Sequence, residues 1–169
     1  MESTLEQFLE QVARRGSWVG GGSVAAVGAA LSAALLEKLV PQPAAVRRFR
    51  RVRRDCLKLV ARDAQAFAAV IRAMRQQDQP AVQRALKQAT EIPWQVFQHA
   101  QTVQAACRSA SRLVKPRFQA DLRCAMALAK ASAESAKILI KTNLDWLRDP
   151  AYTLQMRQRL ATASNRNGG

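Results

Sequence analysis

The sequence predicts an all-α protein, an antiparallel bundle of long helices. Hydrophobic residues fill 49% of the 169 positions, which is enough for one buried core and argues against disorder. Turn-forming residues are few, with 7 glycines and 6 prolines, and aromatic residues reach only 5%. A chain rich in Ala, Leu, Arg and Gln with so few breaks favours helices over strands. Because the breaks are short, neighbouring helices are expected to run antiparallel.

The first three helices are predicted from apolar spacing and from the residues that end each segment. A helix over residues 3–14 follows from apolar side chains at i, i+3, i+4 and i+7, namely Leu5, Phe8, Leu9 and Val12. The second helix opens at Gly22-Ser23 and ends near Leu39, ahead of two prolines. The third covers residues 44–76.

The second half of the chain predicts four more helices. A fourth covers residues 80–90, and a fifth covers 93–114 because proline suits a first helical turn. The sixth, residues 120–147, is long and stops before a proline. A short seventh covers residues 152–162.

These helices are expected to form one domain over residues 1–162. No internal repeat, low-complexity linker or second domain is visible in the sequence, and residues 163–169 are expected to be a flexible tail. The second and sixth helices are rich in Ala, Gly and Ser, which lets helix backbones approach closely. These two helices are therefore expected to be central, crossing each other or their copies in a partner chain.

The chain is strongly basic, with 27 Lys and Arg against 12 Asp and Glu, a net charge of +15 and a pI near 11.3. The run Arg47–Arg54 contains six arginines in eight positions, on the outer faces of an amphipathic helix. Such a field attracts polyanions, and nucleic acid, anionic lipid and a polycarboxylate ligand all fit. Neither base-stacking aromatics nor a known nucleic-acid-binding module accompanies the run.

Cysteine usage and the N-terminus predict a cytoplasmic protein without a metal or a membrane partner. Cys56, Cys107 and Cys124 lie in helical patterns without Cys-x-x-Cys spacing, so reduced core thiols are expected. The first residues lack the basic and apolar regions of a signal peptide. The longest apolar run, Val24–Leu36, is shorter than the roughly 20 residues that span a bilayer.

The glycine-rich helix start, made of Gly20, Gly21, Gly22 and Ser23, is the first candidate site. Three glycines allow a ligand to approach the backbone closely, and the free amides and dipole of a helix start favour an anion. Dinucleotide-binding and Walker motifs do not fit, because no strand precedes the glycines and no lysine follows them. The alternative is a flexible turn with Gly22 or Ser23 as the helix N-cap.

Three further polar residues are candidates for a chemical role. Asp121 lies near the start of the sixth helix, where an ionised carboxylate could act as a general base or bind a cationic centre, or could be a plain N-cap. Asp63 lies inside the third helix, where Asp is disfavoured, so it needs either a function or a surface partner such as Arg62. His99, the only histidine, lacks catalytic partners at suitable spacing and is expected to be structural.

Several segments occur in the order found in one known family. Residues 8–13 precede Gly-Gly-Gly-Ser-Val-Ala-Ala at 20–26, Asp-Ala-Gln-Ala-Phe follows at 63–67, and Glu-Ile-Pro-Trp-Gln-Val, Ala-Asp and Thr-Asn-Leu follow at 91–96, 120–121 and 142–144. Together they resemble the folate cyclodeaminase/cyclohydrolase family, which includes formiminotetrahydrofolate cyclodeaminase and methenyltetrahydrofolate cyclohydrolase. The likeness extends over most of the chain.

The resemblance implies a homodimeric, all-helical enzyme of folate one-carbon metabolism, with either of those two activities. Its substrate would be a tetrahydrofolate derivative, with or without a polyglutamate tail, bound near the subunit interface without a metal or a tightly bound cofactor. Asp121 would be the catalytic acid or base. The substrate-binding residues would be Gly20, Gly21, Gly22, Ser23, Asp63 and Asn143. An acidic tail would be captured with the help of Arg47–Arg54.

Departures from the family pattern leave two alternatives open. Val19 stands where the family has proline and Ala120 where it has serine, and polar residues expected before Asp121 are missing. A catalytically inactive ligand-binding or structural homodimer of the same fold is therefore a second hypothesis. The third, which rests on charge alone, is a basic nucleic-acid-binding helical protein.

Overall fold

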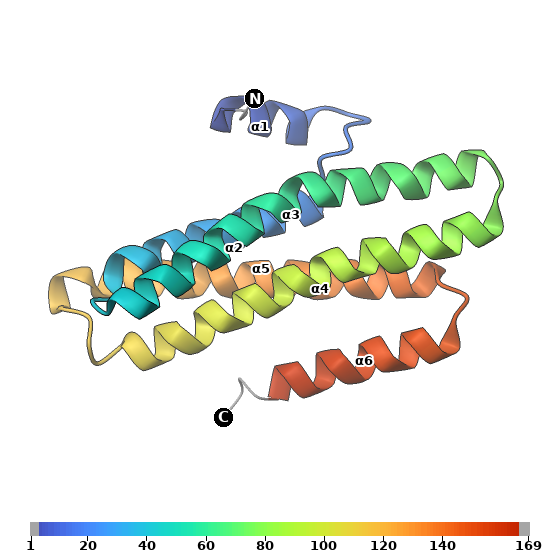
Figure 1. The fold of residues 1–169 in the computed structure, drawn as a ribbon. Helices are drawn as coiled ribbons and strands as arrows, with labels where there is room; N and C mark the ends of the chain where they lie inside the picture. Colours follow the sequence, from blue (N-terminus) through green and yellow to red (C-terminus); the bar gives the residue numbers. More distant parts are fainter. Residues whose placement is uncertain (1–3, 166–169) are drawn as a thin grey trace.

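The computed structural model describes residues 4–165, and within that range it contains only helices and the turns between them (Figure 1). The predicted all-α class is confirmed. The elements are α1 (Leu5–Ala13), α2 (Gly21–Leu39), α3 (Pro43–Arg75), α4 (Gln79–Ala110), a single 3-10 turn η1 (Pro116–Phe118), α5 (Gln119–Trp146) and α6 (Pro150–Asn165).

Helices α2 to α5 form an antiparallel bundle. Each packs against the next in the chain, and α5 returns to contact α2, so the four helices close into a ring. α2 also contacts α4 across the bundle. Figure 1 shows α1 lying outside this ring at one edge and α6 running along the outside of the bundle below α4.

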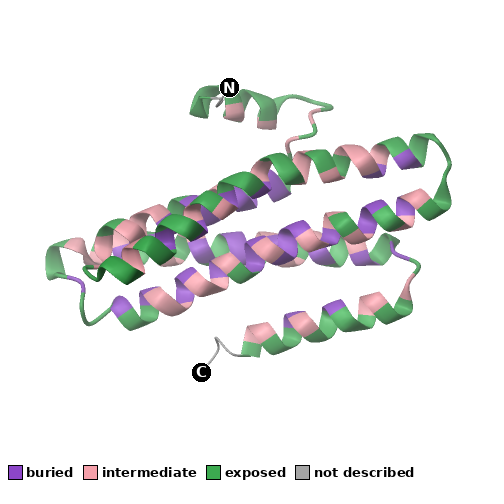
Figure 2. Cartoon of the chain, in the orientation of Figure 1, coloured by how far each residue is buried: buried purple, intermediate pink, exposed green. Residues whose placement is uncertain are grey.

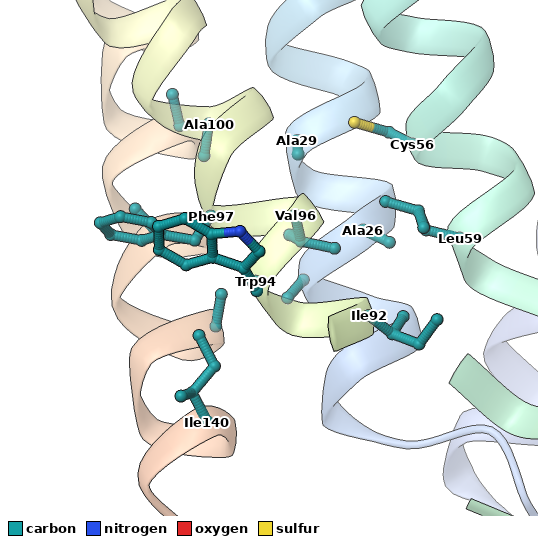
Figure 3. Close-up of a cluster of buried hydrophobic side chains, with 14 of the residues drawn as sticks. Ala26, Ala29, Cys56, Leu59, Ile92, Trp94, Val96, Phe97, Ala100 and Ile140 are labelled. Atoms are coloured by element: carbon teal, nitrogen blue, oxygen red, sulfur yellow. The ribbon is translucent and has the colours of Figure 1, made fainter. Parts of the chain in front are cut away.

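The core fills the space between these helices with interlocking apolar side chains. Figure 2 shows buried residues on the inward faces of the long helices and exposed residues on their outer faces. Leu36, Leu59, Phe97 and Ile140, one from each bundle helix, are fully buried. Figure 3 shows part of this cluster, where the rings of Trp94 and Phe97 stack with centroids 5.7 Å apart.

Small residues bring α2 and α5 close together, as the sequence predicts. Ala26 and Ala29 of α2 and Ala125 and Ala129 of α5 are completely buried, and the two helices are direct neighbours. A Cβ atom added to Gly28 would lie only 2.6 Å from the Ser132 Oγ. The helix backbones therefore approach to a distance that larger side chains would prevent.

α2 is also the one described helix that is long and apolar enough to cross a membrane by length and composition. Half of its most apolar stretch is buried against other helices, and the core helix of a bundle meets the same criterion. Exposed Val24 and Leu31 continue the apolar character onto its outer face.

Two expectations about the ends and thiols need correction. α6 continues to Asn165, so residues 163–165, expected in the flexible tail, are helical, while 166–169 lie outside the described residues. Cys56 and Cys107 are buried, and burial raises the pKa of these thiols to about 12 and about 11. Cys124 is exposed instead, because the α5 face that carries it points away from the bundle ring.

The predicted break before Pro93 is wrong, because α4 runs through this proline as one helix. A proline inside a helix lacks the N–H that would bond the carbonyl four residues earlier, which here belongs to Ala89. The side-chain amide of Asn143 on α5 donates to that carbonyl at 3.1 Å. A tertiary hydrogen bond thus replaces the missing helical one, and sequence-local reasoning could not supply it.

This replacement predicts the cost of removing Asn143. The Asn143→Ala variant leaves the Ala89 carbonyl without a partner, and we expect a loss of about 1–3 kcal/mol in unfolding free energy. Pro93→Ala restores a backbone N–H, so the Ala89 carbonyl regains a helical partner. In that background, Asn143→Ala should lower the unfolding free energy much less. Urea titrations of the four proteins in this double-mutant cycle measure the coupling. Additive costs would show that the two residues act independently.

Candidate functional site

A cavity of about 440 Å³ lies at the end of the bundle where α2 begins. Its size falls in the usual range for sites that hold a small molecule. Its polar lining is sparse and consists of Ser17, Asp63, Thr142 and Asn143, together with the backbone of Gly20, Gly21 and Gly22. Its apolar lining includes Trp18, Phe67, Val70, Ile71, Met74, Leu86, Leu139 and Trp146. The loop before α2 therefore closes a space that α3, α4 and α5 form.

The carboxylate of Asp63 is the ionisable group of this lining. It lies on α3, and its Oδ2 accepts a hydrogen bond from Ser23 Oγ at 2.9 Å. The same hydroxyl lies 3.2 Å from the Val60 carbonyl oxygen, one turn earlier on α3. Ser23 is itself fully buried and does not line the cavity. It therefore fixes the position of Asp63 from behind.

Gly22 provides the space that Asp63 needs. A Cβ atom at position 22 would lie 2.0 Å from Asp63 Oδ1 and 2.5 Å from its Cγ. Any side chain here would force the carboxylate out of its place. Gly21 and Gly20 face no such restriction, since a Cβ would lie 3.8 Å from Leu139 at Gly21 and would meet nothing within 4 Å at Gly20.

The anion at the start of α2 thus comes from the protein itself. The sequence predicts that free amides at this helix start attract an anionic ligand, and the carboxylate of Asp63 lies there. Burial raises the pKa of Asp63 above its ordinary value of 3.8, and hydrogen bonds from the side chain and backbone of Ser23 partly oppose this rise. A carboxyl group with a raised pKa exchanges protons more readily near neutral pH, as a general acid or base must.

Aromatic rings form the mouth of the cavity. Trp18 and Phe67 meet edge to face with centroids 6.0 Å apart. Their exposures of 42% and 47%, and the 64% exposure of Trp146, are high for such large apolar groups. Exposed rings around one carboxyl group suit a flat heterocycle, which can stack on the rings while its polar atoms reach the carboxylate.

Asn143 joins the bundle to the cavity. Its Nδ2 donates to the Ala89 carbonyl, and the residue also lines the cavity. Its Oδ1 accepts no hydrogen bond from residues 4–165 and is therefore open to a donor on a ligand. The predicted group of Gly20, Gly21, Gly22, Asp63 and Asn143 is brought together at this one cavity.

Asp121 lies elsewhere in the subunit. It is in the first turn of α5, and its Oδ2 bonds the Lys38 Nζ at 2.9 Å near the end of α2. Asn143 follows it by 22 positions on the same helix, a separation of about 33 Å along the axis. Asp121 and the glycines are therefore at opposite ends of the bundle within one chain. Its catalytic role stays a prediction that a single subunit does not support.

The apolar walls of the cavity were not identified from the sequence. One signal was available on α3, where Asp63, Phe67, Val70 and Met74 follow the spacing i, i+4, i+7 and i+11 of a single helix face. This face continues the buried core face that carries Phe49. A carboxylate within the apolar face of a bundle helix is unusual and indicates a ligand-facing position. Trp18 and Trp146 give no such signal, because a loop residue and a helix end are brought together here only by the fold.

Comparisons with known proteins agree with this picture. The chain is similar over 97% of its length to the crystal structure of a formiminotetrahydrofolate cyclodeaminase from Thermotoga maritima, with a TM-score of 0.91, 22% sequence identity and 89% of that chain covered. At this identity the likeness establishes the fold. No curated protein sequence matches the chain. The sequence profile of the family described as formiminotransferase-cyclodeaminase matches residues 4–41 and 42–162, nearly the whole chain. The chain therefore belongs to the formiminotransferase-cyclodeaminase family.

Proposed function

We propose that this protein is a folate one-carbon enzyme whose chemistry takes place in the cavity beside Asp63. The observation that carries the proposal is a half-buried carboxyl group with a raised pKa, held by Ser23 in a cavity lined by aromatic side chains. The pyrimidine ring of a tetrahydropterin is flat and carries several N–H donors. It can stack near Trp18 and Phe67 and donate to Asn143 Oδ1. Family membership supports the substrate class.

The reaction needs one group that both takes and returns a proton. In hydrolysis of methenyltetrahydrofolate, water adds to the carbon of the cationic methenyl bridge and its proton passes to Asp63. One carbon–nitrogen bond then breaks as Asp63 returns the proton to the departing nitrogen. The hydroxyl on the carbon loses its proton to solvent, which leaves a formyl group on the other nitrogen. The cationic carbon also attracts the carboxylate, which favours this placement of the substrate.

Cyclising deamination uses the same geometry. A folate nitrogen attacks the formimino carbon, Asp63 takes the proton that this nitrogen loses, and the proton then allows the amino group to leave as ammonia. Both reactions pass through a tetrahedral carbon beside the carboxyl group. Methenyltetrahydrofolate hydrolysis is the first candidate, and formiminotetrahydrofolate is the alternative substrate.

The homodimer implied by family resemblance has a candidate surface on α2 and α5. Exposed Val24 and Leu31 of α2 and Ile138 of α5 are apolar, and α2 carries no charged residue before Glu37. Burying these side chains against a second copy would remove apolar area from water. Sedimentation at micromolar concentration is expected to give a dimer, and Leu31→Glu is expected to shift it toward monomer.

The test of this function is turnover of purified protein. Loss of methenyltetrahydrofolate absorbance should exceed the spontaneous rate at neutral pH, with formiminotetrahydrofolate followed in parallel by ammonia release. Failure on both substrates, with the protein folded, would favour the alternative of an inactive ligand-binding or structural homodimer.

The same assay separates the two candidate carboxylates. Because Asp121 is paired with Lys38 far from the cavity, we expect Asp121→Asn to keep turnover within about threefold of wild type, the effect of a surface change. A loss of about 100-fold or more would instead assign Asp121 a catalytic role, supplied to the cavity of a partner subunit.

A further inference from the structure

The outer face of α3 carries a stripe of cations that the folate proposal does not use. Arg47, Arg51, Arg54 and Lys58 follow the spacing i, i+4, i+7 and i+11, so they share one helix face. They line a shallow hollow of about 480 Å³ together with Arg50 and Asp55. Figure 2 shows the outward face of α3 as exposed. We refer to Arg47, Arg51, Arg54 and Lys58 as the α3 stripe.

Most of this charge is not neutralised by the protein. Glu37 pairs with Arg50 and Arg53 at 2.8 and 3.0 Å, and Asp55 pairs with Lys58 at 3.1 Å. No acidic side chain within residues 4–165 forms an ion pair with Arg47, Arg51 or Arg54. The hollow therefore keeps a net positive charge that an external anion can balance.

The stripe faces away from the folate cavity. At 3.6 residues per turn, its members lie about 120–180° around the α3 axis from Asp63, which faces the cavity. A ligand in the cavity therefore cannot extend an acidic tail onto the stripe without passing around the helix. The partner of the stripe is accordingly independent of the cavity.

The chemistry of the stripe favours a phosphate backbone. Arginine binds phosphate through two parallel N–H donors, and three of the four stripe residues are arginines. The stripe spans 11 positions, about 16 Å, which covers several successive phosphates of a nucleic-acid strand. Insertion into a lipid surface requires apolar side chains beside the cations, but the apolar face with Phe49, Val52 and Leu59 is buried in the bundle.

From this placement we infer that the α3 stripe binds the phosphate backbone of duplex nucleic acid without sequence preference. No aromatic side chain lines the hollow, so stacking on unpaired bases has no platform there. The bundle also keeps α3 from entering a groove. Contacts are therefore limited to phosphates, and affinity depends steeply on salt.

Fluorescence anisotropy with a labelled DNA duplex of about 20 base pairs measures this binding. We expect log K to fall with log salt at a slope of about −3, since three to four phosphates are contacted. The variant Arg47→Gln, Arg51→Gln, Arg54→Gln should lose at least about tenfold in affinity at low salt and should bring the slope to about −1. Absence of duplex binding by the wild type at low salt would overturn the inference.

A charge-matched control separates the stripe from the net charge. Arg112→Gln, Arg148→Gln, Arg157→Gln removes the same charge from exposed positions spread over the surface, and it should change affinity less than threefold. An equal loss in the two triple variants would overturn the inference, because net charge would then explain the binding.

Competitors identify the class of polyanion. Poly-L-glutamate, or vesicles containing phosphatidylglycerol, that displaced the duplex at equal charge concentration would also contradict a phosphate-backbone site. The Asp63→Asn variant should bind the duplex as the wild type does. Duplex binding and folate turnover can therefore fail independently.

Discussion

Replacing Asp63 with asparagine is expected to lower turnover of the folate substrate by about 10²–10⁴-fold while leaving the fold intact. Asparagine keeps the shape of the side chain and can still accept the hydrogen bond from Ser23 Oγ. It cannot accept a proton from water or return one to a leaving nitrogen. Stopped-flow or steady-state kinetics on both candidate substrates measure the loss in turnover. Asp55→Asn, on the outer face of the same helix, is the matched control and should be close to wild type.

Stability should move in the opposite direction from activity. The pKa of Asp63 is raised in the folded protein, chiefly by burial, so the folded state holds the proton more tightly than the unfolded chain. The contribution of Asp63 to the free energy of unfolding therefore falls as pH rises from the ordinary value of 3.8 through the raised folded pKa. Asp63→Asn lacks this dependence, so it should be as stable as the wild type or more stable at neutral pH, with the advantage vanishing in acid. Urea titrations across this pH range measure it.

The pH profile of catalysis provides a second readout. With Asp63 as the base that accepts a proton from water, kcat/KM should rise with pH through the raised pKa of this carboxyl group and then level off. The residual activity of Asp63→Asn should lack that limb. An Asp63→Asn enzyme with wild-type turnover would remove Asp63 from the mechanism and leave the cavity as a binding site at most.

Most of the fold could be predicted because helix boundaries are encoded locally. Apolar spacing, prolines and glycines placed nearly every bundle helix to within a few residues. The exception is Pro93. Proline does favour a helix start, but here α4 continues through it, because Asn143 on α5 supplies the hydrogen bond that the proline cannot donate. The close approach of α2 and α5 was also predictable, because small residues such as Ala26 and Ala129 mark both helices.

The site was only partly predictable because it depends on contacts across the bundle. The glycines and Asp63 are candidates from their chemistry and position, and Asn143 only from family resemblance, but nothing in the sequence says that Gly22 faces Asp63. From the sequence alone, Asp121 and the glycines are equal candidates, because both lie at the start of a helix, where the helix dipole stabilises a negative charge. The structure separates them, because Asp121 pairs with Lys38 at the other end of α2. The separation of Asp121 from the glycines depends on which helix ends lie together in the bundle, and the sequence does not give this.

Gly22→Ala is the substitution that tests how this contact holds the carboxylate. The new Cβ would lie 2.0 Å from Asp63 Oδ1, so the side chain of Asp63 must move and lose its bond to Ser23. Crowding of this kind costs about 1–3 kcal/mol in unfolding free energy, and displacement of the catalytic group should lower turnover by about 100-fold or more. The control is Gly21→Ala, one residue earlier, where the Cβ meets Leu139 at an ordinary 3.8 Å. It should change stability by no more than about 0.5 kcal/mol.

A double-mutant cycle decides whether Asp63 is the cause of that cost. The three atoms nearest to a Cβ at position 22 all belong to the Asp63 side chain, so Asp63→Ala removes the obstacle. Gly22→Ala should then cost little in the Asp63→Ala background, which gives a coupling energy of about 1–3 kcal/mol. If Gly22→Ala is equally costly in both backgrounds, the glycine is needed for its backbone alone. If the coupling is found, the same close contact that excludes every side chain at position 22 also sets where the proton-transferring oxygen lies.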